Sequence, residues 1–441
     1  MRVRFWGTRG SIATPGPDTV HFGGNTSCVE LTTGEDLLIF DCGTGARALG
    51  AALIASAPQP VRASILLGHT HWDHIQGFPF FAPIFTSGNT ISVYAPEGGH
   101  RTLHNTLAGQ MEYTYFPVEL DQLPATIVAH DLVEGTYEIG GARVLTQYLH
   151  HPAITLGYRV EAEGLAVVYL TDHEPFFDQL WQAGAPPGQI ASILHEGDRR
   201  HALFMRGADL VIHDAQYTPE EYPSKKNWGH SHFAYVVEIA AAAGVRRVAL
   251  THHDPGHDDI FLTKLERQAR AVAARCGSPI EVFCAYEGCE VVLTPLATHR
   301  QAEASEQTVL LAPPIHSARI LVADDDPLLR RLAVQVLTRA GHTVEEAQDG
   351  LEALRTMQDQ SFDLLVMDLD MPGMGGLELL QAIRNLETAG RIPVLILTAS
   401  GDEHTAQAGF AAGADDYLTK PFSIPQLVAR VHACLTRTTR G

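Results

Sequence analysis

Four side chains that can bind metal ions fall within six residues of the sequence. They are His69, His71, Asp73 and His74, and they follow the apolar run 63–67, which is typical of a buried strand. Side chains on one face of an extended segment recur every two residues, so His69 and His71 can reach the same ion. Asp73 and His74 lie where the chain should turn toward a neighbouring position. The spacing predicts one segment that serves two metals, and it is far more specific than a lone histidine.

This His-x-His-x-Asp-His pattern resembles the signature of the metallo-β-lactamase-fold hydrolases. The resemblance implies an α/β fold with an N-terminal αββα sandwich, and a two-metal site completed by ligands from later strand ends. It also implies that Asp41, after the apolar run 37–40, braces the metal loop by hydrogen bonds. A flavodiiron oxidoreductase branch of the superfamily usually carries glutamate at the position of His71, so this histidine favours hydrolysis.

Three later strand ends supply the remaining ligands. His150 and His151 follow the run 144–149, and the match to the family's third motif implies that His151 is the ligand. Asp172 follows the run 165–170, and a carboxylate can bridge two cations with its two oxygens.

His252 and His253 follow the run 248–251; the first is preferred and His253 is the alternative. Together the predicted ligands divide into two groups bridged by Asp172: His69, His71 and His151 on one ion, and Asp73, His74 and His252 on the other. We expect two divalent ions, Zn²⁺ first, with Mn²⁺ or Fe²⁺ as alternatives.

Two more residues join Asp73 as candidate catalytic groups. His230 precedes a helix expected from Ser231, which can cap it, to Gly244. The helix dipole disfavours a cationic His230 and a nearby phosphate favours it, so His230 can act as a proton donor or anion clamp. Asp214 and His230 resemble motif residues of ribonuclease Z-type enzymes, with aspartate in place of the usual glutamate.

Two motifs near the N-terminus indicate which branch of the family the chain resembles. Residues 5–11 and 23–27 are most similar to a branch that holds ribonuclease Z-like and cyclic-phosphate phosphodiesterase-like members. No long basic arm is apparent, which disfavours a tRNA substrate. The aromatic segment 113–117 either walls a substrate pocket or packs its loop onto the core.

A second set of polar residues follows strands near the carboxyl terminus. Asp324 and Asp325 end the run 319–323, and later strands end in Asp368, Thr398 and Lys420. In parallel doubly wound sheets such groups gather at the carboxyl ends of the strands. Three carboxylates there need a cation, and Mg²⁺ suits hard oxygen ligands. A flavodoxin would instead need a Ser/Thr/Gly-rich phosphate loop after its first strand. This segment carries aspartates at that place, which would repel the phosphate of FMN.

Residues 318 to about 438 resemble the response-regulator receiver domain, a doubly wound (βα)5 fold. The resemblance makes Asp368 the phospho-acceptor and Asp324 and Asp325 its partners around Mg²⁺. It also makes Thr398 and Lys420 the phosphate-sensing groups, and Tyr417 the switch aromatic. The implied partner is a histidine kinase or a phosphotransfer protein.

Helices and strands of one or more domains must position these groups. The length of the chain, 441 residues, predicts two or three domains. We expect a hydrolase domain over 1–293, a linker over 294–317 and a receiver over 318–441. The formal net charge of −20 opposes a sequence-independent grip on nucleic acid. Six cysteines without C-x-x-C spacing, and no signal-peptide or membrane-spanning run, predict a cytoplasmic protein with reduced thiols.

The sequence thus predicts a two-metal phosphodiesterase acting on a small, cyclic nucleotide or another phosphodiester, controlled by phosphorylation of Asp368. Control through homodimerisation and control by covering the pocket are both open. The alternatives are a non-catalytic metal-binding output module that signals through a protein partner, and a thioester or lactam hydrolase.

Overall fold

The computed structural model describes residues 1–56, 60–97, 102–182, 188–295, 317–385, 392–398 and 413–420, and, near the carboxyl terminus, 427–428, 430–432 and 434–435. The chain forms two compact units, which we describe separately. Most of the predicted linker, 294–317, lies outside the described residues, and the domain boundaries stay a prediction.

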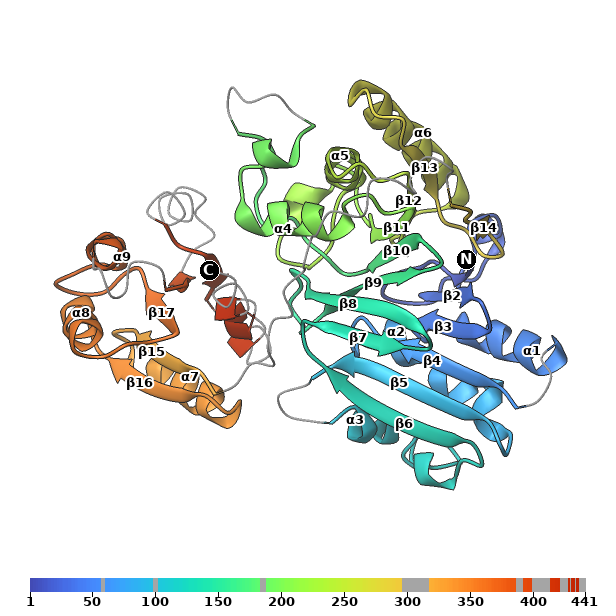
Figure 1. The fold of residues 1–441 in the computed structure, drawn as a ribbon, viewed down its shortest axis with the longest axis horizontal. Helices are drawn as coiled ribbons and strands as arrows, with labels where there is room; N and C mark the ends of the chain where they lie inside the picture. The colour runs from blue at the N-terminus through green and yellow to red at the C-terminus, as the bar shows by residue number, and fades with distance from the viewer. Residues whose placement is uncertain are drawn as a thin grey trace. The chain divides into compact units, whose positions relative to one another are not determined.

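The first unit is a sandwich of two seven-stranded sheets (Figure 1). The first sheet has the order β14-β1-β2-β3-β4-β5-β6, and its strands are β1 (Arg2–Gly7), β2 (Cys28–Thr33), β3 (Asp36–Phe40), β4 (Arg62–Leu66), β5 (Thr90–Pro96), β6 (Thr126–Leu132) and β14 (Glu290–Val292). The second has the order β13-β12-β11-β10-β9-β8-β7, and its strands are β7 (Thr136–Ile139), β8 (Ala142–Tyr148), β9 (Leu156–Ala162), β10 (Leu165–Leu170), β11 (Leu210–Asp214), β12 (Arg247–Thr251) and β13 (Glu281–Cys284).

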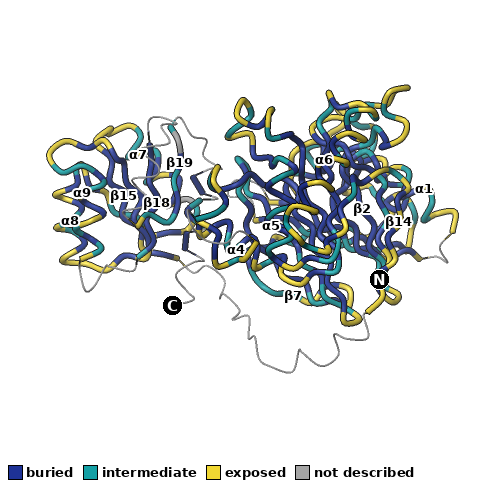
Figure 2. Tube along the Cα trace, turned by 90° about the horizontal axis from the view of Figure 1, so that it is seen from above, coloured by how far each residue is buried: buried dark blue, intermediate teal, exposed yellow. Residues whose placement is uncertain are grey.

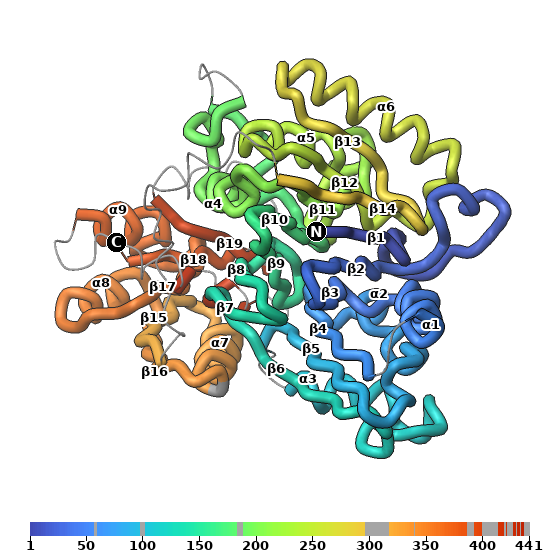
Figure 3. The backbone as a smooth tube through the Cα atoms, turned by 45° about the vertical axis from the view of Figure 1, so that its right-hand side comes forward, coloured from blue at the N-terminus to red at the C-terminus, as the bar shows by residue number. Residues whose placement is uncertain are grey.

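Helices cover the outer faces of both sheets. Side chains of α4 (Glu196–Met205), α5 (Phe233–Ala242) and α6 (Asp259–Arg275) share one buried cluster with the second sheet. Figure 3 shows the backbones of these helices beside the strands of that sheet. On the first sheet, α1 (Ala46–Ser56) and α3 (Leu103–Gln110) do the same. Shorter turns of helix are α2 (Trp72–Ile75), η1 (Pro17–Thr19), η2 (Phe78–Phe80), η3 (Ala82–Phe85), η4 (Leu120–Gln122), η5 (Ile190–Ser192) and η6 (Tyr222–Ser224).

Aromatic rings join the two inner faces. The ring of Phe40 on β3 stacks on Tyr169 of β10, with centroids 4.8 Å apart, and Tyr158 of β9 lies 6.3 Å from Phe40. All three side chains are buried. The order helix, sheet, sheet, helix confirms the predicted αββα sandwich.

Parallel pairing brings the functional strand ends together. Strands β10, β11 and β12 run parallel, with Leu170 paired to His213 and Asp214 paired to Thr251. In the first sheet β3 and β4 are also parallel, with Phe40 level with Leu66. The residues that follow these strands therefore leave the sheets at the same edge.

The expected cap of α5 is wrong. The helix begins at Phe233, and the Nδ1 atom of His232 accepts a hydrogen bond from the amide of Tyr235. The Ser231 hydroxyl instead donates to the carbonyl of His173, at 2.6 Å. A tertiary hydrogen bond thus takes the serine away from the helix end, while Gly244 follows that helix with a positive φ as expected.

The second unit is a five-stranded parallel sheet with the order β16-β15-β17-β18-β19. Its elements are β15 (Arg319–Ala323), α7 (Pro327–Arg339), β16 (Thr343–Ala347), α8 (Gly350–Asp359), β17 (Leu364–Asp368), α9 (Gly376–Arg384), β18 (Val394–Thr398) and β19 (Asp416–Thr419). This order is that of a doubly wound fold. Figure 2 shows β15 and β18 largely buried and parts of α8 and α9 exposed. Asp326 caps α7, and its side chain accepts hydrogen bonds from the amides of Leu328 and Leu329.

The six cysteines form no disulfide among the described residues. None of the helices in the described part of the chain has the length and apolar character needed to cross a membrane.

Candidate metal centre

The predicted ligands meet at one edge of the sandwich in two adjoining groups. In each group the nitrogen and carboxylate oxygen atoms lie within 4.8 Å of one another. The first group contains His69, His71, His151 and Asp172, and the second contains Asp73, His74 and His252. The structure therefore brings together seven residues from four separate parts of the sequence, in the division that the sequence analysis proposed.

Asp172 touches both groups. Its Oδ1 lies 3.2 Å from Nε2 of His252, and its Oδ2 lies 3.4 Å from Nε2 of His74. The same Oδ2 lies 3.6 Å from Nε2 of His69 and 3.8 Å from Nε2 of His151. This placement suits a carboxylate that bridges two cations.

The chemistry of the donors fits divalent cations. Both ring nitrogens of His69, Nε2 of His74 and Oδ1 of Asp172 are buried and have no hydrogen-bond partner among the described residues. Such atoms are costly to bury unless they bind something. Burial lowers the pKa of His69 well below its usual value, and it lowers that of His151 to about 3. These imidazoles are therefore neutral, as metal ligands must be.

Asp41 holds the metal loop as predicted. Its Oδ1 accepts a hydrogen bond from the amide of Gly68 at 2.8 Å, and its Oδ2 lies 2.6 Å from Nδ1 of His74. The hydroxyl of Tyr169, from the second sheet, donates to the same Oδ2 at 2.6 Å. A carboxylate on the far nitrogen of a ligand histidine fixes its tautomer and its orientation.

Three turns at this edge have strained backbones. Asp41, Asp172 and His252 have φ values of 56°, 62° and 59°, in the left-handed region that residues with a side chain seldom occupy. Each directly follows a strand, or follows it by two residues in the case of Asp172. The surrounding fold therefore imposes these conformations on residues of the site.

The amino-terminal loop packs against the second group of ligands. The amide of Ser11 donates to Oδ2 of Asp73 at 2.8 Å, and the amide of Gly10 donates to the carbonyl of His253 at 3.0 Å. A Cβ atom on Gly10 would lie only 2.4 Å from Nδ1 of His252. Nε2 of His253 lies 2.9 Å from the carbonyl of Ala285, so His252 and not His253 belongs to the cluster.

His230 and Asp214 form a close pair beside the two ligand groups. Nδ1 of His230 lies 2.5 Å from Oδ2 of Asp214, and the amide of Ser231 donates to Oδ1 of Asp214 at 2.9 Å. The His230 ring lies 4.9 Å from the ring of His252 and 5.5 Å from that of His151. Burial lowers the pKa of His230, but the carboxylates of Asp214, Asp172 and Asp73 together outweigh this effect and raise the pKa to about 9.

His151 is anchored by a loop that the sequence analysis did not single out. Its Nδ1 lies 3.0 Å from the carbonyl of Gly229. Glu174 in turn accepts hydrogen bonds from the amides of Gly229 and Asn227, at 2.8 Å and 2.7 Å. The neighbouring His150 lies outside the ligand groups, with its Nδ1 2.9 Å from the carbonyl of Glu174.

One residue of the aromatic segment 113–117 has the packing role, the second of the two alternatives expected from the sequence. Phe116 is half-buried and contacts Phe80 edge to face, with ring centroids 5.5 Å apart. Tyr113 and Tyr115 are 79% and 75% exposed. Only Phe116 therefore packs the loop against the rest of the unit.

The second unit has its own acidic site. Ligand atoms of Asp324, Asp325 and Asp368 lie within 4.8 Å of one another. Nζ of Lys420 donates to Oδ2 of Asp324 and to Oδ2 of Asp368, both at 2.7 Å. Thr398 ends the adjacent strand β18, and its carbonyl accepts from the amide of Lys420 at 2.7 Å. Tyr417 lies on β19 and is half-buried.

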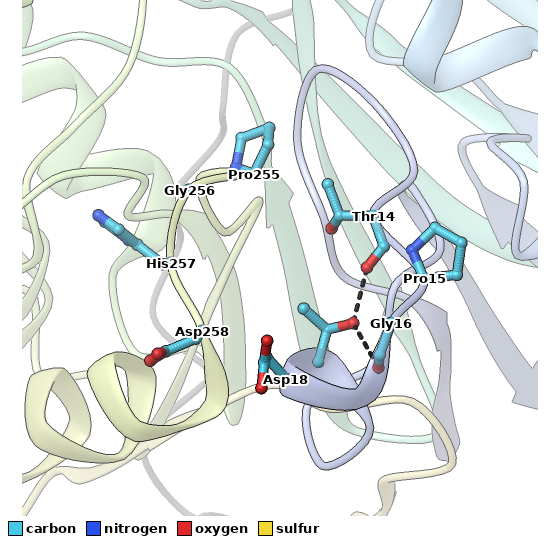
Figure 4. A pocket seen from close by; sticks show the side chains of 9 residues that line it. Thr14, Pro15, Gly16, Asp18, Pro255, Gly256, His257 and Asp258 are labelled. Carbon is cyan, nitrogen blue, oxygen red and sulfur yellow. Dashed lines mark hydrogen bonds between the residues drawn. The ribbon is translucent and has the colours of Figure 1, made fainter.

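A separate hollow of about 310 Å³ lies between the loop 14–19 and the turn 255–258 (Figure 4). Asp18 and Asp258 contribute carboxylates to its wall. None of the predicted metal ligands lines it, so it is distinct from the metal centre.

Known proteins match each unit. Residues 37–253 match the family model of the beta-lactamase superfamily domain, and residues 320–432 match that of the response regulator receiver domain. Over 122 residues the chain is 45% identical to the response regulator MprA of Mycobacterium ulcerans. This match covers 28% of this chain and 52% of that protein. The chain thus spans about half the length of the curated relatives it matches.

Two solved structures show similarity to one unit each. The short form of human tRNase Z is 22% identical, with a TM-score of 0.45, and the match covers 67% of this chain and 100% of that one. The chemotaxis response regulator CheY4 of Vibrio cholerae is 36% identical, with a TM-score of 0.26, and the match covers 26% of this chain and 96% of that one.

Proposed function

The chain joins a beta-lactamase superfamily domain to a response regulator receiver domain, and we propose that it is a two-metal phosphodiesterase whose activity is controlled by phosphorylation. The fold supports a metal-dependent hydrolase, and it implies divalent metal binding at the His/Asp site. The observation that carries the finer proposal is the placement of the Asp214–His230 pair beside both groups of ligands.

Seven residues would hold two divalent cations. His69, His71 and His151 would bind one, Asp73, His74 and His252 the other, and Asp172 both. When bound, such cations supply Lewis-acid activation of water and neutralise the charge of a phosphate. Zn²⁺ is the expected metal for this nitrogen-rich set, with Mn²⁺ or Fe²⁺ as alternatives.

His230 is the proposed proton donor. Its Nδ1 faces Asp214, which leaves Nε2 to carry a proton to a leaving-group oxygen. A carboxylate behind the imidazole fixes the tautomer and favours the protonated ring, as in other histidine acid–base pairs. The side chain of Asp214, although shorter than the glutamate of ribonuclease Z-type motifs, reaches His230.

A panel of substrates tests the activity. The full chain, reconstituted with Zn²⁺ or Mn²⁺, is assayed with bis(p-nitrophenyl) phosphate, cyclic nucleotides, a thioester and a β-lactam. We expect turnover of phosphodiesters, and its loss in His69→Ala together with bound metal. Turnover of only the thioester or lactam would replace the proposed reaction, and a metal-loaded protein without any turnover would be a binding module.

Control by the receiver completes the proposal. Asp368 would accept a phosphoryl group from a histidine kinase or a phosphotransfer protein, with Mg²⁺ bound by Asp324, Asp325 and Asp368. Lys420 contacts Asp324 and Asp368, so its ammonium group is close enough to bind an oxygen of a phosphoryl group on Asp368. Phosphorylation of the receiver would then change turnover by the hydrolase domain.

A further inference from the structure

The loop between η6 and His230 displays two side chains that no step described so far uses. We propose that Lys225 and Trp228 form a subsite for the part of a nucleotide that lies beyond the scissile phosphodiester. The nucleobase stacks on Trp228, and the ammonium of Lys225 binds a second phosphate. This inference rests on the proposed function, because it takes the metal centre as the place of cleavage.

A buried carboxylate holds the backbone of the loop in place by hydrogen bonds. Glu174, which is 5% exposed, accepts hydrogen bonds from the amides of Asn227 and Gly229, and from the hydroxyl of Tyr222 at 3.2 Å. Asn227 has a φ of 67°, in the left-handed region. A strained turn fixed by a buried charge presents its exposed side chains in one arrangement, and such preorganisation lowers the entropic cost of binding.

The side chains of Lys225 and Trp228 contribute little to the packing of the unit. Trp228 is 58% exposed, which is unusual for so large an aromatic group. Nζ of Lys225 lies 4.3 Å from the centroid of the Trp228 ring and 5.9 Å from that of Tyr217. Among the described residues Lys225 forms no ion pair, whereas the neighbouring Lys226 is paired with Asp178. A cation held over aromatic rings keeps its charge available to an anion.

The loop also adjoins the reacting groups. The ring of Tyr217 lies 6.0 Å from that of His230, so one aromatic side chain separates Lys225 from the proposed proton donor. Gly229, the residue after Trp228, accepts from the ligand His151. A molecule with its phosphodiester at the metal centre therefore extends toward this loop.

A nucleotide satisfies both side chains at once. Base–aromatic stacking tolerates any base, because every base has a π face, and together with positive charge it is a general way to hold a nucleotide chain. An aliphatic phosphodiester would leave Trp228 in water and Lys225 without an anion. The chain as a whole is acidic, with a formal charge of −20, so a lysine without a carboxylate partner beside the site favours a phosphorylated substrate.

Three esters with the same leaving group separate the two contributions to turnover. They are methyl p-nitrophenyl phosphate, the p-nitrophenyl ester of thymidine 5′-phosphate, and the same thymidine ester carrying a 3′-phosphate. We expect kcat/KM of the wild type to rise about tenfold with the base and about threefold more with the second phosphate. Trp228→Ala should abolish the first gain through KM, Trp228→Phe should keep most of it, and Lys225→Ala should abolish only the second.

Lys226→Ala is the matched control, because it removes the same charge from the same loop but from a lysine that is already paired. It should keep both gains. If the wild type cleaves all three esters equally well, or if Lys226→Ala loses as much as Lys225→Ala, the subsite is wrong while the phosphodiesterase stands.

Calorimetric titration with thymidine 3′,5′-bisphosphate tests the subsite without turnover. The metal-loaded wild type should bind this nucleotide about tenfold more tightly than Trp228→Ala does. Equal affinities would overturn the subsite even for a protein that cleaves none of the esters, an outcome that would separately end the proposed function.

Discussion

Nδ1 of the metal-site residue His74 lies 2.6 Å from Oδ2 of Asp41, a carboxylate that also receives hydrogen bonds from Gly68 and from Tyr169 of the opposite sheet. One side chain therefore contacts a predicted ligand, the start of the metal loop and a strand of the opposite sheet. The support of the site is shared by both halves of the sandwich, which makes several of its properties testable.

Asp41→Asn tests this support. The amide keeps the size of the side chain but cannot accept in the same way from both His74 and Tyr169, so the imidazole loses its fixed orientation. We expect metal affinity to fall between about 10-fold and 100-fold, measured by competition with a chromophoric chelator. A circular dichroism spectrum equal to that of the wild type is the control for folding, and unchanged affinity in a folded variant would refute the bracing role.

The position of Asp172 between the two ligand groups predicts a difference in metal stoichiometry. Asp172→Asn should reduce occupancy at both sites, because its oxygens face His252 on one side and His69 on the other. His252→Ala should chiefly empty one. Metal analysis after dialysis against a weak chelator measures both variants against the wild type, for which we expect two ions. Equal stoichiometry in the two variants would mean that Asp172 does not bridge.

Asp198 on α4 predicts how stability depends on pH. Its burial raises the pKa to about 7 from an ordinary value of 3.8, although the Tyr235 hydroxyl donates to its Oδ1. Between these values the folded state keeps a proton that the unfolded state releases. The free energy of unfolding should therefore fall as pH rises through this window, by up to about 1.4 kcal/mol per pH unit from this group.

Asp198→Asn isolates that contribution, since an amide is neutral at every pH. Urea denaturation of the variant and the wild type at matched metal content should show the two stabilities diverging between pH 4 and pH 7, with the variant less sensitive to pH. Parallel curves for the two proteins would show that Asp198 is ionised in the folded state.

Asp368→Asn tests control by the receiver. The variant should fail to take up a phosphoryl group from acetyl phosphate, and its Mg²⁺ affinity should fall because one of three carboxylates becomes neutral. Hydrolase turnover of the wild type should change after treatment with the phosphodonor, and that of the variant should not. If the rates are equal in every state, the receiver does not regulate this activity.

Strand ends were the part of the site that the sequence could predict. An apolar run followed by His or Asp is a local pattern, and parallel strands bring such ends to one edge. For this reason the sequence predicts one site for His69, Asp172, His252 and a histidine after residue 149, although they span most of the first unit, and the resemblance to the metallo-β-lactamase fold selects His151. The same logic placed Asp324, Asp368 and Lys420 together in the second unit.

Contacts between distant segments were not predictable. Ser231 is a good helix cap by type, but the carbonyl of His173 takes its hydroxyl. The loop that displays Trp228 is shaped by Glu174, whose carboxylate binds the amide of Asn227 from 53 positions earlier in the chain. No periodicity or local motif marks such a residue, because its importance comes from the partner that the fold supplies.

The left-handed backbones of Asp41, Asp172 and His252 imply that the cage has its shape before any ion arrives. Rearranging these turns for an ion of another size would mean repacking the strands from which they emerge. If two cations bind here, the polypeptide, and not the cation, would set the distances between the ligand atoms. Selection among metal ions would then depend on this fixed arrangement of ligand atoms. An ion of unsuitable size would bind weakly, because the site would not rearrange around it.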